Sequence, residues 1–103
     1  MDVNNVSLIG SVATPVELRR LDGERKVASF LLAVDRPGQA DKADFVRIAA
    51  WNKQAELCEQ HVEKGRRVAV DGRLRSRSWE AADGQRRTAI EVVANQVQFF
   101  ETS

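Results

Sequence analysis

Two short segments place aromatic and cationic side chains on one side of predicted β-strands. Residues 45–51 read Phe-Val-Arg-Ile-Ala-Ala-Trp, and residues 73–79 read Arg-Leu-Arg-Ser-Arg-Ser-Trp. Successive strand residues point to opposite faces, so this alternation gives two sets that each share a face. The sets are Phe45, Arg47 and Trp51, and Arg73, Arg75, Arg77 and Trp79. Rings interleaved with guanidinium groups match the flat bases and charged backbone of unpaired nucleic acid.

The aromatic residues of the first segment also fit a buried position, because large apolar side chains usually lie inside a protein. Val46, Ile48 and Ala50, however, form a consistently apolar opposite face. We therefore expect that apolar face to pack in the core, so that Phe45 and Trp51 point toward solvent or a ligand. Three further aromatic residues lie in or beside apolar runs and are assigned to the core or to a subunit contact: Phe30, Phe99 and Phe100.

Positive charge is concentrated in one part of the chain. The formal net charge is only +1, but residues 66–87 hold seven arginines and no lysine against three carboxylates, a local net charge of +4. Arginine outnumbers lysine twelve to four over the whole sequence. Its planar guanidinium group suits bidentate contact with phosphate and stacking on rings. The plain alternative is a solvated basic hairpin, since runs of charge usually lie on the surface.

Residues suited to catalysis are few. His61 is the single histidine and falls late in a predicted helix, where solvent exposure or the negative end of the helix accounts for it. Cys58 lies three residues earlier, but no third group is available to orient a catalytic pair. Neither a phosphate-binding glycine loop nor a metal-ligand spacing is found. We therefore expect a protein that is not an enzyme and uses no metal or other cofactor.

The 103 residues fit one domain, residues 1–103, with a core large enough to need no disulfide. Cys58 is the single cysteine, which favours a reducing compartment. The first residues lack the basic and apolar regions of a signal peptide, and no apolar run is long enough to cross a bilayer. We expect a soluble intracellular protein without a membrane partner.

Hydrophobic alternation and turn residues predict five strands and one helix. The strands are Val3–Val12, Lys26–Asp35, Asp44–Trp51, Arg67–Trp79 and Arg86–Phe100, with Val16–Leu21 as a short continuation of the first. The helix is Lys53–Lys64, with Asn52 as its N-cap and Gly65 as its C-terminal cap. One helix between the third and fourth of five strands is the order of the OB-fold, a partly open all-β barrel. This order alone also allows other small five-stranded barrels.

Glycines mark the expected turns and bends. Asp22-Gly23 and Asp83-Gly84 are hairpin turn signals. Gly10 and Gly72 fall inside predicted strands, where they allow the sharp bends that close a barrel. The polar segment 36–42 contains Pro and Gly and is expected to be an exposed loop.

In order and spacing, these segments resemble the bacterial single-stranded DNA-binding proteins from Val3 to about Val97. The residues that carry the likeness are Val3–Gly10, Phe45–Lys53 with Ala55-Glu56, Lys64-Gly65, Val68–Trp79, Asp83-Gly84 and Thr88–Val93. The resemblance implies an OB-fold, a homotetramer and sequence-tolerant binding and protection of single-stranded DNA in replication, recombination and repair. It also implies a cytoplasmic, nucleoid-associated protein and a subunit contact at Val3–Leu8.

The resemblance assigns roles to single residues. Aromatic residues at the positions of Phe45, Trp51 and Trp79 stack on bases in that family. Basic residues at the positions of Arg47, Lys53, Arg75 and Arg77 contact the DNA backbone. Arg73 shares the face of the second segment, and Arg86 lies in the same arginine-rich region, so both join the predicted DNA-binding set.

The sequence departs from the family pattern in three places. Arg36-Pro37-Gly38 supplies no stacking ring, and Thr14–Glu17 stands where the family commonly has Asp-Pro-Glu. The sequence ends at Glu101-Thr102-Ser103 without the family's acidic tail, so recruitment of replication or repair proteins through such a tail is not expected. It is either a trimmed core or a short paralogue without a tail. The alternatives are a replication-restart accessory protein of the same fold, a protein-interaction adaptor, and an enzyme acting on nucleic acid.

Overall fold

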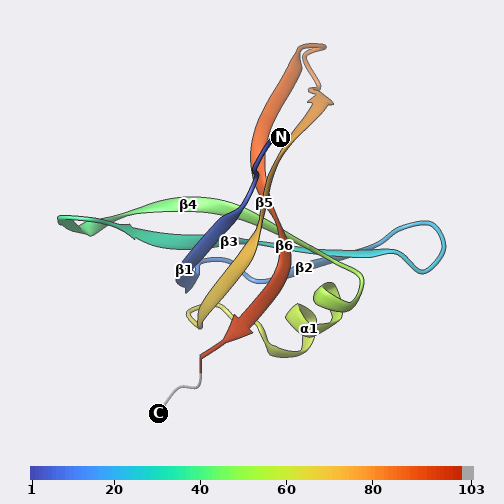
Figure 1. The fold of residues 1–103 in the computed structure, drawn as a ribbon. Coiled ribbons are helices and arrows are strands. Elements are labelled where there is room, and N and C mark those ends of the chain that lie inside the picture. The colour runs from blue at the N-terminus through green and yellow to red at the C-terminus, as the bar shows by residue number, and fades with distance from the viewer. Residues whose placement is uncertain (101–103) are drawn as a thin grey trace.

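The computed structural model describes residues 1–100, and within them six strands and one helix form (Figure 1). In chain order the elements are β1 (Val6–Val12), β2 (Glu17–Arg20), β3 (Lys26–Arg36), β4 (Gln39–Trp51), α1 (Lys53–His61), β5 (Arg67–Glu80) and β6 (Arg86–Phe99). The predicted domain extends to Ser103, so its last three residues lie outside the described part. No helix among the described residues is long and apolar enough to span a membrane.

The strands close into a ring. Their order is β1-β5-β6-β4-β3, and β1 pairs back onto β3 through Ser11↔Ala33 and Val12↔Leu32. β2 runs on along β3 beyond β1, so β1 and β2 act as one interrupted strand, as the short continuation in the sequence predicted. With β1 and β2 counted as one, the ring has five strands, and α1 lies between the third (β4) and the fourth (β5). The predicted all-β OB-fold barrel is confirmed.

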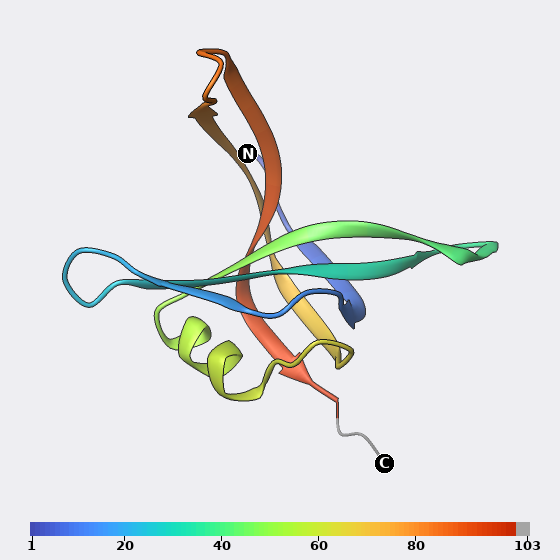
Figure 2. The same cartoon turned by 180° about the vertical axis from the view of Figure 1, so that it is seen from behind.

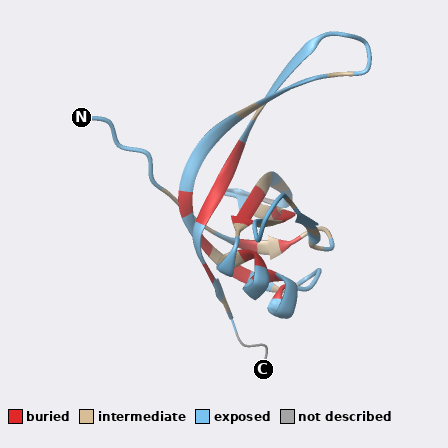
Figure 3. Cartoon of the chain, turned by 90° about the vertical axis from the view of Figure 1, so that its right-hand side faces the viewer, coloured by how far each residue is buried: buried red, intermediate tan, exposed pale blue. Residues whose placement is uncertain are grey.

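The core fills the inside of this ring. Apolar residues of alternate parity point inward and are almost fully buried, among them Leu32, Ile48, Val68, Val70 and Val92. Helix α1 adds Ala55 and Cys58 to the same cluster. Figure 3 shows buried segments along the barrel and an exposed arm projecting from it. Phe30 is buried as predicted, Phe99 packs partly against the core, and Phe100 is exposed.

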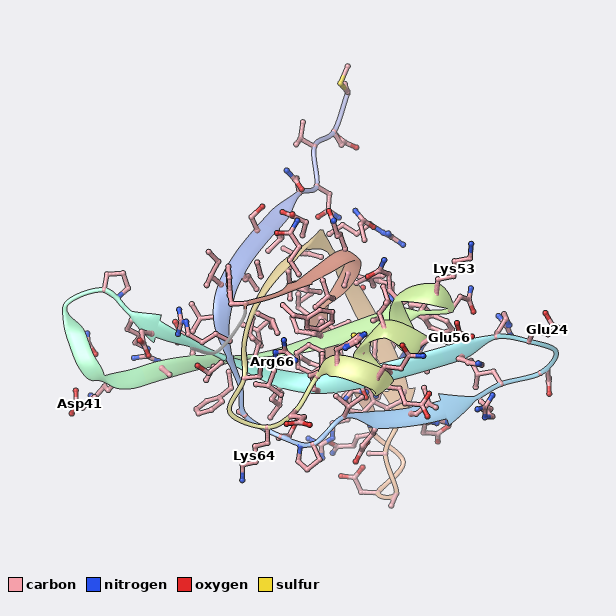
Figure 4. The ribbon with its side chains drawn as sticks, turned by 90° about the horizontal axis from the view of Figure 1, so that it is seen from below. Glu24, Asp41, Lys53, Glu56, Lys64 and Arg66 are labelled. Atoms are coloured by element: carbon pink, nitrogen blue, oxygen red, sulfur yellow. The ribbon has the colours of Figure 1, made fainter. Side chains whose placement is uncertain are left out.

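Long hairpins extend beyond the barrel in different directions (Figures 1 and 2). The β5–β6 hairpin runs to Glu80↔Arg86 and forms the arm at the top of Figure 1. The β2–β3 and β3–β4 hairpins point to opposite sides, with Glu24 at the tip of one and Asp41 near the tip of the other (Figure 4). β5 and β6 stay paired along the whole arm, from Gly72↔Ala94 to Glu80↔Arg86.

The described side chains of the segment 36–42 are exposed as predicted, but most of the segment is strand rather than loop, with Pro37 and Gly38 as the turn. β3 and β4 pair regularly as far as Asp35↔Ala43, and the register then shifts to Arg36↔Gln39, which leaves residues 40–42 without a partner in β3. Gly38 has φ 75°, a left-handed conformation that glycine adopts without strain. The sequence signals of Pro and Gly therefore located the turn correctly, but they did not show that the strands continue up to it.

Helix α1 is shorter than predicted. It ends at His61, and the C-cap is Val62 in an extended conformation rather than Gly65. This turn buries Val62 in the core, and the Val62 amide donates to the Cys58 carbonyl. Asn52 does occupy the N-cap, but its side chain makes no capping bond and its Oδ1 accepts from the Lys26 amide at 3.2 Å instead. The first strand also starts later, at Val6 rather than Val3.

A bulge in β6 changes which residues face the core. Asp71 pairs with Gln96 and Gly72 with Ala94, so Asn95 is left without a partner in β5. Because of this extra residue, Val92 and Val97 both point inward although they differ in parity. The predicted bend at Gly72 therefore lies directly opposite the bulge.

Candidate nucleic-acid interface

The two aromatic and cationic segments lie on one continuous face of the barrel. β6 lies between β5 and β4, so it separates the two segments by a single strand. On β5 the residues Arg73, Arg75, Arg77 and Trp79 pair with alternate residues of β6 and share a face. The parallel pairing Ile48↔Val92 brings Arg47 of β4 alongside Glu91 of β6. The core side of β4 is the opposite one, where Ile48 and Ala50 are fully buried.

A buried carboxylate lies at the centre of this face. Glu91 is 2% exposed, and its oxygens are 2.6 Å from Arg75 and 3.2 Å from Arg47 Nε. Arg77 lies 3.9 Å away on the outer side. These arginine side chains are each about two-fifths exposed, so they cover the carboxylate and present their remaining donors to solvent.

Trp51 lies at the edge of the same cluster. The guanidinium carbon of Arg75 is 5.8 Å from the centre of its ring. The ring is half-buried, and its Nε1 is covered without making a hydrogen bond among the described residues. Trp51 lines an open cleft of about 510 Å³ together with Arg73, Arg75, Val93, Ala94 and Asn95. Arg73 donates to Asn95 Oδ1 at 3.3 Å across this cleft. The Trp51 ring in this lining is suited to stacking on a base, and the guanidinium groups of Arg73 and Arg75 are suited to binding its phosphate.

The second tryptophan lies further out along the β5–β6 arm. Trp79 is 40% exposed, and the guanidinium carbon of Arg77 lies 4.9 Å from the centre of its ring. Arg87 is directly opposite Trp79 in the register and is also paired with Asp83 at 3.0 Å. Phe45 is 63% exposed on β4. Both strands thus present an exposed ring, and each also carries a tryptophan beside a guanidinium group.

Two of the predicted residues are not brought into this cluster. Lys53 is the first residue of α1 and lines a separate depression with Glu24, Arg25, Asn52 and Glu56 (Figure 4). Arg86 pairs with Glu80, one position out of phase with Trp79, so it points to the other face of the arm. Arg87 occupies the position on the shared face.

Sequence reasoning also missed three residues of this face: Glu91, Arg87 and Asn95. One signal was present, because Glu91 is a lone carboxylate within an apolar run from Ala89 to Ala94, and a buried carboxylate requires cationic partners. The position of Arg87 follows from the register across the Asp83-Gly84 turn. Asn95 had no signal, since the bulge that exposes it depends on the curvature of the closed barrel.

The groups suited to catalysis stay apart from this face. Burial raises the pKa of the Cys58 thiol to about 11, so it remains protonated at neutral pH and is a poor nucleophile. The His61 ring lies 5.4 Å from the ring of Phe99, and Arg66 packs over the same phenyl ring and donates to the His61 carbonyl.

The pKa of Glu56 is lowered by its hydrogen bond with Lys26, a contact between α1 and β3. Among the described residues, no three metal-ligating side chains come together.

Comparison with known proteins gives consistent matches. The model of the single-strand binding protein family matches residues 3–100. Single-stranded DNA-binding protein 3 of Clostridium acetobutylicum is 45% identical over 104 residues, covering 96% of this chain and 72% of that protein. The single-stranded DNA-binding protein of Clostridium tetani is 42% identical, covering 96% and 71%. A solved structure described as Plasmodium falciparum SSB complex with ssDNA is 29% identical, with a TM-score of 0.84 over 98% of this chain and 97% of that one.

Proposed function

The chain belongs to the single-strand binding protein family, and we propose that it binds single-stranded DNA without strong sequence preference. The observation that carries this proposal is the face on which Trp79 lies open beside Arg77, Trp51 is half-buried beside Arg75, and Phe45 is exposed. The relative from Plasmodium falciparum is described in complex with single-stranded DNA, and its fold matches this chain over nearly its full length.

In the proposed mechanism, aromatic rings bind the bases and guanidinium groups bind the phosphates. Unpaired bases stack on the exposed faces of the tryptophans and of Phe45, and every base offers such a flat face, so stacking tolerates any sequence. Arg47, Arg73, Arg75 and Arg77 attract the phosphates that follow each base. A duplex keeps its bases stacked on each other and offers the protein its phosphates alone.

The proposed role is to coat and protect unpaired DNA in replication, recombination and repair, in the cytoplasm of a bacterial cell. The two relatives named above that are more than 40% identical to this chain come from bacteria of the genus Clostridium. Coating requires binding alone, so we propose that the chain performs no catalysis and needs no cofactor. Lys53 and Arg86 lie away from the central face, and in this account they contact only DNA that continues past it.

Salt dependence tests the electrostatic half of this mechanism. If four guanidinium groups each contact one phosphate, the slope of log Kobs against log salt is expected to be about −3 per subunit. Fluorescence polarisation of a labelled thymidine oligomer at several salt concentrations measures this slope. A duplex of equal length is expected to bind about tenfold more weakly or worse, because at least one base–ring stack is lost. Equal affinity for duplex and single strand would contradict the proposal.

We also propose that the protein assembles as a homotetramer, with the N-terminal region at a subunit contact. Val3 is 85% exposed and Ile9 is 53% exposed, and apolar side chains this open are suited to burial against another subunit. Light scattering of the purified protein is expected to give about four times the 11.5 kDa mass of the chain. A monomer mass at micromolar concentration would refute this assembly.

A further inference from the structure

Glu91 is a buried acidic residue at the centre of a face that attracts an anion. It is 2% exposed, and its two oxygens contact Arg75 at 2.6 Å and Arg47 at 3.2 Å. The contacts come from three neighbouring strands, because Arg75 is on β5, Glu91 on β6 and Arg47 on β4. A negative charge at this place weakens phosphate binding by its charge alone, so its presence calls for an explanation.

The geometry of the two arginines supplies that explanation. Arg47 donates to Glu91 through Nε, and its terminal guanidinium nitrogens make no hydrogen bond to any residue that the structure describes. Arg75 donates through one terminal nitrogen, and its guanidinium group is also held against the Trp51 ring. Both side chains are about two-fifths exposed, so their unused donors face solvent. A long arginine side chain without such anchors samples many rotamers and loses that freedom on binding.

We propose that Glu91 is a positioning residue that holds the guanidinium groups of Arg47 and Arg75 as a preformed clamp for the phosphates of single-stranded DNA. This inference rests on the proposed function. The carboxylate stays in contact with both arginines when DNA binds, and each guanidinium group then bridges Glu91 on its inner side and a phosphate on its outer side. The gain from fixed donors exceeds the cost of one buried negative charge.

The competing account makes the opposite prediction. If Glu91 is only an internal anion that phosphate must displace, removing its charge makes the face more basic and strengthens binding. In the positioning account, removal frees the two arginines, which also repel each other, and binding weakens. The sign of the change in affinity therefore separates the two accounts.

The test is Glu91→Gln, which removes the charge at nearly constant volume, with Glu80→Gln as a matched control. Glu80 is exposed on the same arm, lies opposite Arg86 and points away from Trp79, so its replacement removes the same charge and leaves the contacts of Arg47 and Arg75 unchanged. Polarisation with a labelled thymidine oligomer is expected to show about tenfold weaker binding for Glu91→Gln. Glu80→Gln is expected to bind as tightly as the parent or slightly more tightly.

The salt slope gives a second readout. In the positioning account, Glu91→Gln loses two phosphate contacts, so the slope of log Kobs against log salt is expected to fall in magnitude by about 1.4. If phosphate displaces Glu91 instead, the slope of the variant is expected to be unchanged or steeper. Tighter binding of a folded Glu91→Gln protein, or binding equal to that of Glu80→Gln, would overturn the proposal. If the parent itself fails to bind single-stranded DNA, both the proposed function and this inference fail. A parent that binds while Glu91→Gln is not weakened refutes this inference alone.

A measurement on the parent protein keeps the test independent of whether Glu91→Gln folds. The Nε–H group of Arg47 donates to a buried carboxylate and is expected to give a slowly exchanging proton resonance. In the positioning account this resonance persists when a thymidine oligomer is added. Its loss on DNA binding would mean that phosphate displaces Glu91, and the proposal would be wrong.

Discussion

Replacing Trp79 by alanine is expected to weaken binding of a thymidine oligomer about 5- to 150-fold, because one base–ring stack contributes about 1–3 kcal/mol. Trp79 is the clearest position for this test, since it is 40% exposed on the arm and lies outside the buried core. Its ring contacts the Arg77 guanidinium group, which approaches to 4.9 Å from the ring centre. Urea unfolding of the variant is therefore expected to match that of the parent.

The control for this experiment is Trp79→Phe, which keeps an aromatic face at the same place. It is expected to retain most of the affinity, whereas a role limited to packing the arm would make phenylalanine and alanine equivalent for DNA binding. A Trp79→Ala protein that binds as tightly as the parent would remove Trp79 from the interface. Trp51 is a less direct test site, because its half-buried ring also contacts Arg75, so its removal changes the position of that arginine as well.

Gly72→Ala is expected to destabilise the protein by about 3 kcal/mol, at the upper end of the range for overpacking a well-filled site. A Cβ at this position would collide with the Val93 carbonyl oxygen, and it would lie 3.0 Å from the Ala94 Cα. These are backbone atoms of β6 at the bulge, and they cannot move aside by rotating a side chain. Relief requires β5 and β6 to separate where the arm leaves the barrel.

Gly23→Ala is the matched control, since it introduces the same methyl group at a position with open space. Gly23 has φ 73°, so the expected cost is only the roughly 1–2 kcal/mol of a left-handed alanine. Urea denaturation of the three proteins measures the difference. If Gly72→Ala is no less stable than Gly23→Ala, the close approach of the two strands does not constrain this residue.

The alternation of apolar with polar or aromatic residues was sufficient to predict which face of β4 and β5 turns toward the core. Val46, Ile48 and Ala50 turned toward the core, and Phe45 remained exposed, because a strand with one buried face has only one acceptable register. The order of strands around one helix similarly predicted the barrel. These features depend on short-range pattern, which the sequence carries directly.

Features that depend on long-range geometry were not predicted. The bulge at Asn95 shifts the parity of β6, and only the closed barrel determines where that shift falls. The early end of α1 follows from the need to bury Val62, which outweighs the preference for glycine as a helix cap. Contact between Arg47 and Glu91 joins β4 to a strand 44 residues away along the chain. Neither spacing nor composition specifies such a pair.

The central claim is that the rings of Trp51 and Trp79, each beside a guanidinium group, stack on unpaired bases. Its most direct test is the intrinsic tryptophan fluorescence of the parent during titration with an unlabelled thymidine oligomer, with polarisation of a labelled oligomer run in parallel. We expect quenching that saturates with binding and that falls by a clear fraction in Trp79→Ala. Binding of the oligomer without any quenching would contradict the account, because the DNA would then occupy a surface away from both tryptophans.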